Sequence, residues 1–445
     1  MYRADWVLPV ATPPISRGEL LVTGDGRIAA VAPAGALDLP ADVEVRELGA
    51  TVLLPGLVNV HAHPELAVYR GALEDLPFRD WILRLVGSKR QAIRPEDSAA
   101  AARWTMVEAL SAGMTTLAAT EASGAGVEAM REAGIRGIVY QEAFGPDPST
   151  AADSMAELEA SLARLRGLAG GLVQVGVSPH APFTVSDELY RQVVALARAE
   201  RLPIAAHIAE SAAERALVVT GEGDFAPGLR ARGIATPPRA GSPIELLGRL
   251  GVLDVRPLLI HCVDVSDEDI ALIAESGSAV AHCPIANAKL GHGLAPLPAM
   301  LEAGVRVGIG TDSVGSNNRL DLLEEARMAS LLQRAAGSRY DVLNSADLLR
   351  LCTIDGARAL GLDDRIGTLE PGKDADLCAV ALQGVHTVPS YDPLSTLFHA
   401  ARGSDVILTV VAGRVLYDRG QHLSLDVERV RREVEDAARR LREVL

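Results

Sequence analysis

The chain has 445 residues, of which 48% are hydrophobic and 23% charged, and its formal net charge is −15. This is the composition of a soluble globular protein, and the length exceeds what one compact core usually organises, so a large domain and a smaller one are expected. The acidic balance argues against nucleic acid or an anionic membrane as a partner, because both bind basic surfaces. The four cysteines form no CxxC pair and the first residues do not resemble a secretory signal, which predicts reduced thiols in a cytoplasmic protein.

The first 55 residues alternate short β-like runs with turns rich in Gly, Pro and Asp, as in GELLVTGDGRIAAVAP and VEVRELGATVLLP. Short strands at close spacing predict a small sheet or sandwich. The same pattern of short β-like runs returns near the C-terminus in DADLCAVAL and SDVILTVVAGRVLYD. We therefore predict one small β-sandwich domain built from both termini, comprising residues 1–55 and 366–424.

Between these ends, strand candidates alternate with helical patterns such as SDELYRQVVALARAE and DEDIALIAESG. The strand candidates are Thr51–Val58, Met114–Ala119, Gly134–Tyr140, Leu172–Val177, Pro203–Ala206, Pro257–Ile260, Ser278–Ala281 and Val305–Gly310. Such alternation implies parallel strands, and eight units over about 300 residues suit a closed barrel better than an open sheet. The predicted fold is thus α/β, with a (β/α)8 TIM-like barrel over residues 56–365.

The last segment, residues 425–445, is predicted to be an amphipathic helix. Apolar residues recur there at helical spacing, namely Val427, Val430, Val434, Ala438 and Leu441. We interpret it as a docking helix that covers apolar surface.

Candidate metal ligands fall at the ends of the predicted strands. His61 and His63 close the first strand in GLVNVHAHPE, and residues two apart on a strand point to the same face, so both can bind one ion. Alone, an HxH pair is a weak signal. However, His180, His207, His261 and Asp312 also end later strand candidates, and the carboxyl ends of barrel strands converge on one mouth. Each histidine alone could equally be a core or loop residue; their shared position predicts a metal site.

Nitrogen ligands with one carboxylate suit a single zinc ion, with iron or manganese as alternatives. Three histidines and an aspartate leave one position for water, as a catalytic site requires. Glu210 follows His207 by three residues and could pass a proton to a substrate nitrogen, although alone it could equally be a solvated loop acid.

Several motifs together resemble the amidohydrolase superfamily, specifically its single-metal deaminase branch. They are PGLVNVHAH, SPHAPFTVS, HIAES, LLIHCVDVSDEDI, AHCPIANAKLGHGLAP, GTDSVGSNN and GTLEPGKDADL. The resemblance implies a β-sandwich beside a βα barrel, with His61, His63, His207 and Asp312 as ligands of an ion that activates water. It further implies that His261 and Asp312 take the proton of that water, that Glu210 protonates the substrate ring, and that His180 faces the substrate.

Much of the chain is similar to S-adenosylhomocysteine/methylthioadenosine deaminases. It departs from them at Arg90, where they have a ribose-binding Glu, and at Gln141, where they have Arg. The segments NVHAHPELAVYRG and FRDWILRLV, and a long insert at residues 220–243, are instead similar to the aminodeoxyfutalosine deaminases of the alternative menaquinone pathway.

Three further residues are candidates for contact with the substrate. Glu65 and Trp81 are expected to face it, with solvent exposure and core packing as the alternatives, and Asn287 is a candidate contact or support for the site. The 220–243 insert is a lid candidate, because long loops on a catalytic face are often functional. His292, in the GHG turn, is expected to be solvated.

We therefore predict a zinc-dependent deaminase of an adenine-type nucleoside, with 6-aminodeoxyfutalosine favoured over S-adenosylhomocysteine or methylthioadenosine. Guanine, a triazine or a cyclic amide are alternative substrates. A non-enzymatic scaffold is disfavoured because every ligand and Glu210 are present. Two-metal relatives usually need a bridging carboxylated lysine, and no lysine ends the fourth strand. The expected partner is a small nucleoside or heterocyclic amine, and a homo-oligomer stays open.

Overall fold

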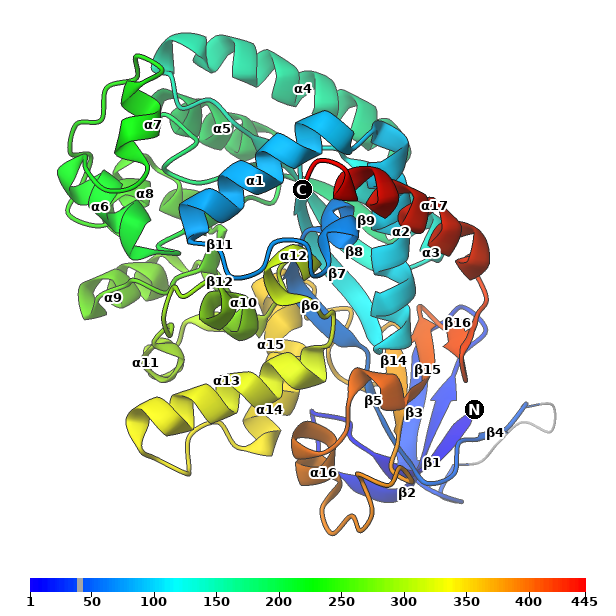
Figure 1. Cartoon of the computed structure of the whole chain (residues 1–445). Coiled ribbons are helices and arrows are strands. Elements are labelled where there is room, and N and C mark those ends of the chain that lie inside the picture. The colour runs from blue at the N-terminus through cyan, green and yellow to red at the C-terminus, as the bar shows by residue number, and fades with distance from the viewer. Residues whose placement is uncertain (38–42) are drawn as a thin grey trace.

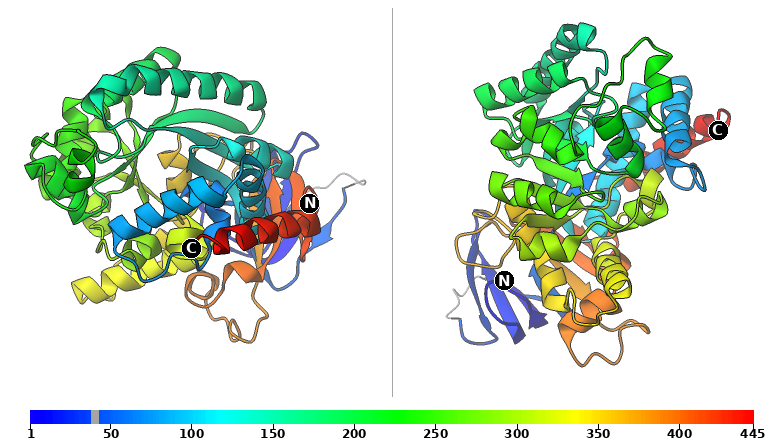
Figure 2. Two further views of the ribbon diagram at one scale, coloured as in Figure 1. Left: turned by 45° about the horizontal axis from the view of Figure 1, so that its top comes forward. Right: turned by 90° about the vertical axis from the view of Figure 1, so that its left-hand side faces the viewer.

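The computed structural model describes residues 1–37 and 43–445. Figures 1 and 2 show a mixed β-sheet that contains the N-terminus and, beside it, a larger part in which strands and helices alternate. Over the described ranges, no helix has the length and apolar character needed to cross a membrane.

Both ends of the chain contribute to the mixed sheet, which has nine strands among the described residues. They are β1 (Tyr2–Val7), β2 (Ile15–Val22), β3 (Ile28–Pro33), β4 (Arg46–Glu47), β5 (Thr51–Pro55), β14 (Leu377–Ala381), β15 (Val406–Val411), β16 (Arg414–Asp418) and β17 (Gln421–His422). The two ends meet where β5 pairs antiparallel with β14. Through this pairing the hydrogen bonds form one continuous mixed sheet built from both ends of the chain.

The predicted strand Thr51–Val58 is two strands. β5 belongs to the mixed sheet, whereas β6 (Leu57–Ala62) starts the alternating part. Gly56 lies between them, and a Cβ atom there would be 2.1 Å from Thr115 Oγ1, so glycine is required at this close approach. The prediction merged the two strands because apolar residues continue on both sides of Gly56.

Eight parallel strands carry the alternating part, and the described residues place them in two four-stranded sheets. The first contains β6, β7 (Met114–Glu121), β8 (Arg136–Ala143) and β9 (Val173–Pro179), and the second contains β10 (Ala205–Ile208), β11 (Leu258–His261), β12 (Ala279–His282) and β13 (Arg306–Ile309). The sheets meet at both edges: His207 N–H donates to His180 O at 2.9 Å, and Thr311 N–H donates to His61 O at 3.0 Å. The predicted order of parallel strands is confirmed.

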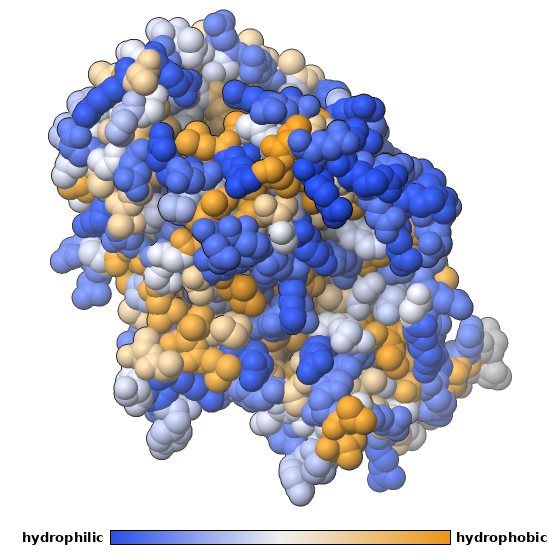
Figure 3. All heavy atoms as spheres, in the orientation of Figure 1, coloured by the Kyte–Doolittle hydropathy of each residue, from blue (hydrophilic) through white to orange (hydrophobic). Residues whose placement is uncertain are grey.

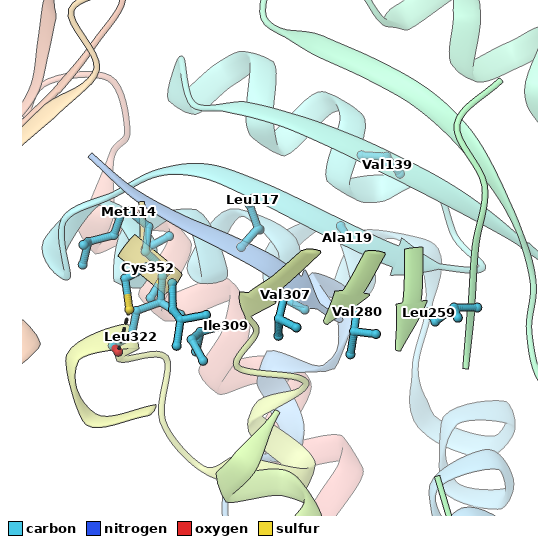
Figure 4. Close-up of a cluster of buried hydrophobic side chains, with 14 of the residues drawn as sticks. Met114, Leu117, Ala119, Val139, Leu259, Val280, Val307, Ile309, Leu322 and Cys352 are labelled. Atoms are coloured by element: carbon cyan, nitrogen blue, oxygen red, sulfur yellow. Dashed lines mark hydrogen bonds between the residues drawn. The ribbon is translucent and has the colours of Figure 1, made fainter. Parts of the chain in front are cut away.

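The two faces of the parallel strands bury different apolar clusters. Leu117 and Leu259 belong to a large cluster that includes Leu322 of the surrounding helices, as Figure 4 shows. Their strand neighbours Ala118 and Ile260 belong to a second cluster. This alternation follows from the two-residue period of a strand buried on both faces. It fixes the register of the strand ends, where the candidate ligands lie.

The helices and 3-10 turns of the described residues are η1 (Pro64–Tyr69), α1 (Phe78–Ala92), α2 (Pro95–Ser111), α3 (Ala125–Ala133), η2 (Pro148–Thr150), α4 (Ala151–Leu168), α5 (Asp187–Glu200), α6 (Ala212–Thr220), α7 (Ala226–Arg230), α8 (Pro243–Arg249), η3 (Leu253–Val255), α9 (Asp267–Ser276), α10 (Pro284–Lys289), α11 (Leu297–Glu302), α12 (Val314–Asn317), α13 (Leu322–Gly337), α14 (Ser345–Leu351), α15 (Ile354–Ala359), α16 (Pro393–His399), η4 (Gly403–Asp405) and α17 (Val427–Arg442). The two helical patterns singled out in the sequence form α5 and α9. Each starts at a serine whose hydroxyl accepts a backbone N–H, Ser186 for α5 and Ser266 for α9.

The C-terminal helix α17 lies across α2 and η1. Val430, Ala437 and Leu441 are buried, and the last two join an apolar cluster with Trp81 of α1. Ala437 is buried in place of the predicted Ala438, which is half-buried. Figure 3 shows hydrophilic side chains over the outer face of this region, as expected for an amphipathic helix.

Candidate active site

The four predicted metal ligands come together at the strand ends. His61 lies in β6, His63 follows it, His207 lies in β10 and Asp312 follows β13. Asp312 Oδ1 is 3.2 Å from His61 Nε2 and 3.4 Å from His63 Nε2, and His63 Nε2 is 3.3 Å from His207 Nε2. Donor atoms about 2.0–2.1 Å from a tetrahedral ion are separated from each other by about 3.3–3.4 Å. These three separations are those of neighbouring donors around one small ion. His61, His63 and Asp312 lie within 4.8 Å of one another, and His207 adjoins them through His63.

Two of the imidazole donors, His63 and His207, are held in the unprotonated form by their surroundings. Burial, followed by repulsion from His61, lowers the pKa of His63 to about 3, and burial lowers the pKa of His207 well below its ordinary value. Within the described part of the chain, His61 Nε2 and His207 Nδ1 are buried without a hydrogen-bond partner. Buried polar atoms without partners are costly unless something else binds there. The residues present thus fit a divalent ion.

Asp312 is oriented by the short helix that follows it. Ser316 Oγ in α12 donates to Asp312 Oδ2 at 2.6 Å, which leaves Oδ1 facing the histidines. The Asp312 backbone has a φ of 57°, a left-handed conformation that is uncommon outside glycine and often found at functional sites. Burial alone would raise the pKa of Asp312, but its interactions with His61 and His63 hold that pKa well below the ordinary value. The carboxylate is therefore ionised.

His261 lies beside this cluster, with its ring centroid 5.7 Å from that of His61 and 5.5 Å from that of His207. Its Nδ1 atom is 3.0 Å from Asn287 Oδ1. An amide oxygen can only accept, so Nδ1 carries the proton and Nε2 keeps a lone pair. Burial lowers the pKa of His261, which keeps this neutral form. Asn287 thus supports His261 from behind.

Glu210 faces His261 from the end of β10. Its Oε1 atom is 3.6 Å from His261 Nε2. The backbone N–H groups of Ala209 and Glu210 donate to the Glu214 carboxyl group at 2.8 Å and 3.1 Å, so Glu214 holds the turn that presents Glu210. Burial alone would raise the pKa of Glu210, but His261 and then the His292 contact bring it below its ordinary value.

The expectation that His292 is solvated is wrong. Its side chain is 3% exposed and its Nε2 atom is 3.2 Å from Glu210 Oε1. Gly291 and Gly293 have φ values of 72° and 108°. These conformations suit glycine and let the turn direct His292 inward.

His180 also lies at the cluster, since its ring centroid is 4.8 Å from that of His207. Its Nδ1 atom is 2.8 Å from Thr184 Oγ1, while Nε2 is 3.9 Å from Glu142 Oε1. That Glu142 oxygen is buried with no hydrogen-bond partner among the described residues. Burial, followed by the charge of Glu65, raises the pKa of Glu142 to about 8. Glu142 was not identified from the sequence.

The other two predicted substrate contacts are engaged by protein groups. The buried Glu65 carboxylate pairs with Lys89 and accepts the Ser123 N–H at 3.1 Å. Trp81 is 7% exposed and packs with Leu66 in the apolar cluster below α17. A substrate role for Glu65 or Trp81 stays a prediction.

Aromatic side chains from three separate segments gather near the cluster. Phe225, in the 220–243 insert, stacks on Phe183 with ring centroids 4.1 Å apart, and Phe78 at the start of α1 lies 6.2 Å from Phe225 and 6.5 Å from Phe183. Phe183 is in turn 5.8 Å from His180. Three of the five phenylalanines of the chain therefore meet beside the site.

A cluster of three imidazoles and a carboxylate at the ends of parallel βα strands, flanked by a histidine and a glutamate, defines a metal-dependent hydrolase centre. The amidohydrolase family matches residues 52–416, and the chain belongs to that family. It is a hydrolase that acts on carbon–nitrogen bonds other than peptide bonds.

Individual relatives cover almost the whole chain. The chain is 35% identical over 429 residues to 5-methylthioadenosine/S-adenosylhomocysteine deaminase of Moorella thermoacetica, which covers 95% of each chain. A zinc-bound crystal structure of an adenosine deaminase from Xanthomonas campestris is 30% identical, with a TM-score of 0.86 and coverage of 99% of this chain and 98% of that one. Zinc-bound atrazine chlorohydrolase from Arthrobacter aurescens has a TM-score of 0.85 at 24% identity, with coverage of 98% and 100%, a likeness that concerns the fold alone.

Proposed function

We propose that this chain is a hydrolytic deaminase, which replaces the amino group of an adenine-type nucleoside with oxygen and releases ammonia. The observation that carries the proposal is the buried Glu210–His261 pair beside the four donor atoms. A protein that only stores a metal has no need of a proton-transfer pair there. The deaminase names of the relatives support the same reaction.

The residues His61, His63, His207 and Asp312 would hold the ion, and this donor set favours zinc over iron or manganese. A divalent ion bound there lowers the pKa of water to about 7, which supplies a nucleophile at neutral pH.

The remaining steps are proton transfers by residues of the chain. Glu210 Oε1 takes one proton from the attacking water and passes it to the ring nitrogen next to the reacting carbon. His261 Nε2 takes the second proton and passes it to the amino group, while the charge of the ionised Asp312 stabilises the protonated His261. The water oxygen bonds to the ring carbon, the bond from that carbon to the amino group breaks, and ammonia leaves with the second proton.

We propose a 5′-substituted adenine nucleoside as substrate. Methylthioadenosine and S-adenosylhomocysteine are supported by the names of relatives, and 6-aminodeoxyfutalosine by the segments after HxH and the 220–243 insert. Gln141 donates to Ala122 O at 2.9 Å and Arg90 is exposed. The other amide atom, Gln141 Oε1, is buried without a hydrogen-bond partner among the described residues, as is Glu142 Oε1. Gln141 and Glu142 are therefore proposed as residues that could choose between these substrates.

The test is the ultraviolet change of adenine to hypoxanthine with zinc-loaded protein and a panel of 6-aminodeoxyfutalosine, S-adenosylhomocysteine, methylthioadenosine, 5′-deoxyadenosine and adenosine. Turnover of one member supports the proposal and identifies the 5′ group. Silence across the panel, with zinc bound, contradicts it and directs the search to guanine, triazines and cyclic amides.

We further propose that the eight strands close into one (β/α)8 barrel, which the hydrogen bonds at both sheet edges support. The division into residues 1–55 with 366–424, 56–365 and 425–445 is part of this proposal. The 220–243 insert is proposed to act as a lid, because its Phe225 lies on the aromatic group beside His180.

A further inference from the structure

His292 turns inward from an exposed turn to contact a buried carboxylate. Its neighbours Gly291 and Gly293 are exposed, whereas the His292 side chain is 3% exposed and lies 3.2 Å from Glu210 through Nε2. The Phe78 ring meets the His292 ring edge-on, with centroids 4.3 Å apart. The imidazole thus lies within ion-pair distance of a carboxylate on one side, without a hydrogen bond of regular geometry among the described residues, and packs on an aromatic ring on another side.

The segment that carries His292 also supports the second proton-transfer group. Asn287, in α10, contacts His261 Nδ1 through its amide oxygen. The His292 backbone N–H donates to Asn287 O at 2.9 Å. Lys289, between them, anchors the segment through Gly315 O at 3.1 Å and Glu74 Oε1 at 2.9 Å. One short segment, residues 287–292, therefore reaches both His261 and Glu210.

We propose that His292 is a positioning residue that holds the Glu210 carboxyl group toward the substrate, and that residues 287–292 fix Glu210 and His261 as a pair. The inference rests on the proposed function only for the identity of the reaction. His261 is 3.6 Å from Glu210 Oε1, farther than His292, so loss of His292 removes the nearer of these two imidazole contacts. Misplacement of a reacting group by about 1 Å can cost about 100-fold in rate.

The experiment compares zinc-loaded His292→Leu, His292→Gln and His292→Asn with the wild type. Leucine keeps the apolar contact with Phe78 and loses the nitrogen, glutamine carries an amide nitrogen that reaches the same point, and asparagine is one carbon shorter. We expect kcat to fall about 10–100-fold in the leucine and asparagine variants with little change in KM, and glutamine to recover most of the activity. The matched control is His386→Gln, because His386 also contacts a carboxylate, Asp405 at 2.7 Å, outside the site.

The second measurement is the crystal structure of the zinc-loaded wild type and of His292→Leu. We expect the Glu210 carboxyl group to rotate away from its wild-type position in the variant. An unchanged kcat, or a change in KM alone, overturns the inference, as does a Glu210 that does not move. If the wild type itself deaminates no member of the panel, the proposed function fails, and the two structures still decide whether His292 positions Glu210.

Discussion

Replacing Ser316 with alanine removes one hydroxyl group and leaves all four metal ligands in place. Ser316 Oγ donates to Asp312 Oδ2 at 2.6 Å, and both residues are buried. A hydrogen bond to a charged group contributes about 1.5–3 kcal/mol, which corresponds to about 10–100-fold in an equilibrium constant. Loss of a residue that supports a metal ligand typically weakens metal affinity by about the same factor. We therefore expect Ser316→Ala to bind zinc about 10–100-fold more weakly.

The assay is competition for zinc between the protein and a chelating dye at constant pH and ionic strength. The matched control is Ser330→Ala, which removes a buried hydroxyl that donates to Leu343 O at 2.9 Å. This control should lose some stability and keep the wild-type zinc affinity. Wild-type zinc affinity in Ser316→Ala would refute the reasoning that Asp312 is a ligand oriented through its second oxygen.

Three further predictions concern proton transfer, pH and the aromatic group. Glu210→Gln should keep zinc, measured by mass spectrometry of the metal. Its kcat should fall about 100–10,000-fold because the amide cannot carry the proton. A variant with half the wild-type rate would contradict the role of Glu210 in proton transfer. Burial raises the pKa of Glu142 from 4.5 to about 8. The contribution of protonated Glu142 to the free energy of unfolding is therefore fully present below pH 4.5 and is lost as the pH rises through 8. In Glu142→Gln, the free energy of unfolding measured with urea should lose this decrease between pH 5 and 8, which is at most about 1.4 kcal/mol per pH unit in the wild type. Equal slopes for both proteins would contradict the raised pKa of Glu142. Phe225→Ala removes the stack on Phe183, worth about 0.5–1.5 kcal/mol, and should raise KM severalfold; an unchanged KM would argue against contact between this aromatic group and the substrate.

The sequence predicted the strand-end residues well for a simple reason. Parallel strands expose their carboxyl ends on the same side, so His61, His207 and His261 had to meet once their strands were placed. The apolar runs that precede them are buried on both faces and leave little freedom in register. The structure brings these side chains together as predicted, while their ligand and catalytic roles remain proposals.

The supporting residues could not be predicted in the same way. Ser316 and Glu214 act through side-chain directions set by the helices α12 and α6, which follow the strand ends. A buried glutamate such as Glu142, in β8, cannot be distinguished from a solvated one by spacing. His292 was misjudged because a Gly-His-Gly turn is typical of exposed loops, while its direction here comes from packing on Phe78. Trp81 was expected to face the substrate, and packing below α17 accounts for its place in the fold.

The most direct test of the account is a zinc titration of the metal-stripped protein, with ammonia release measured on the active member of the panel. A single-ion site predicts no activity without metal and a linear rise in activity that ends at one zinc per chain. Activity in the stripped protein, or a rise that continues to a second equivalent, would contradict a single-ion deaminase built on His61, His63, His207 and Asp312.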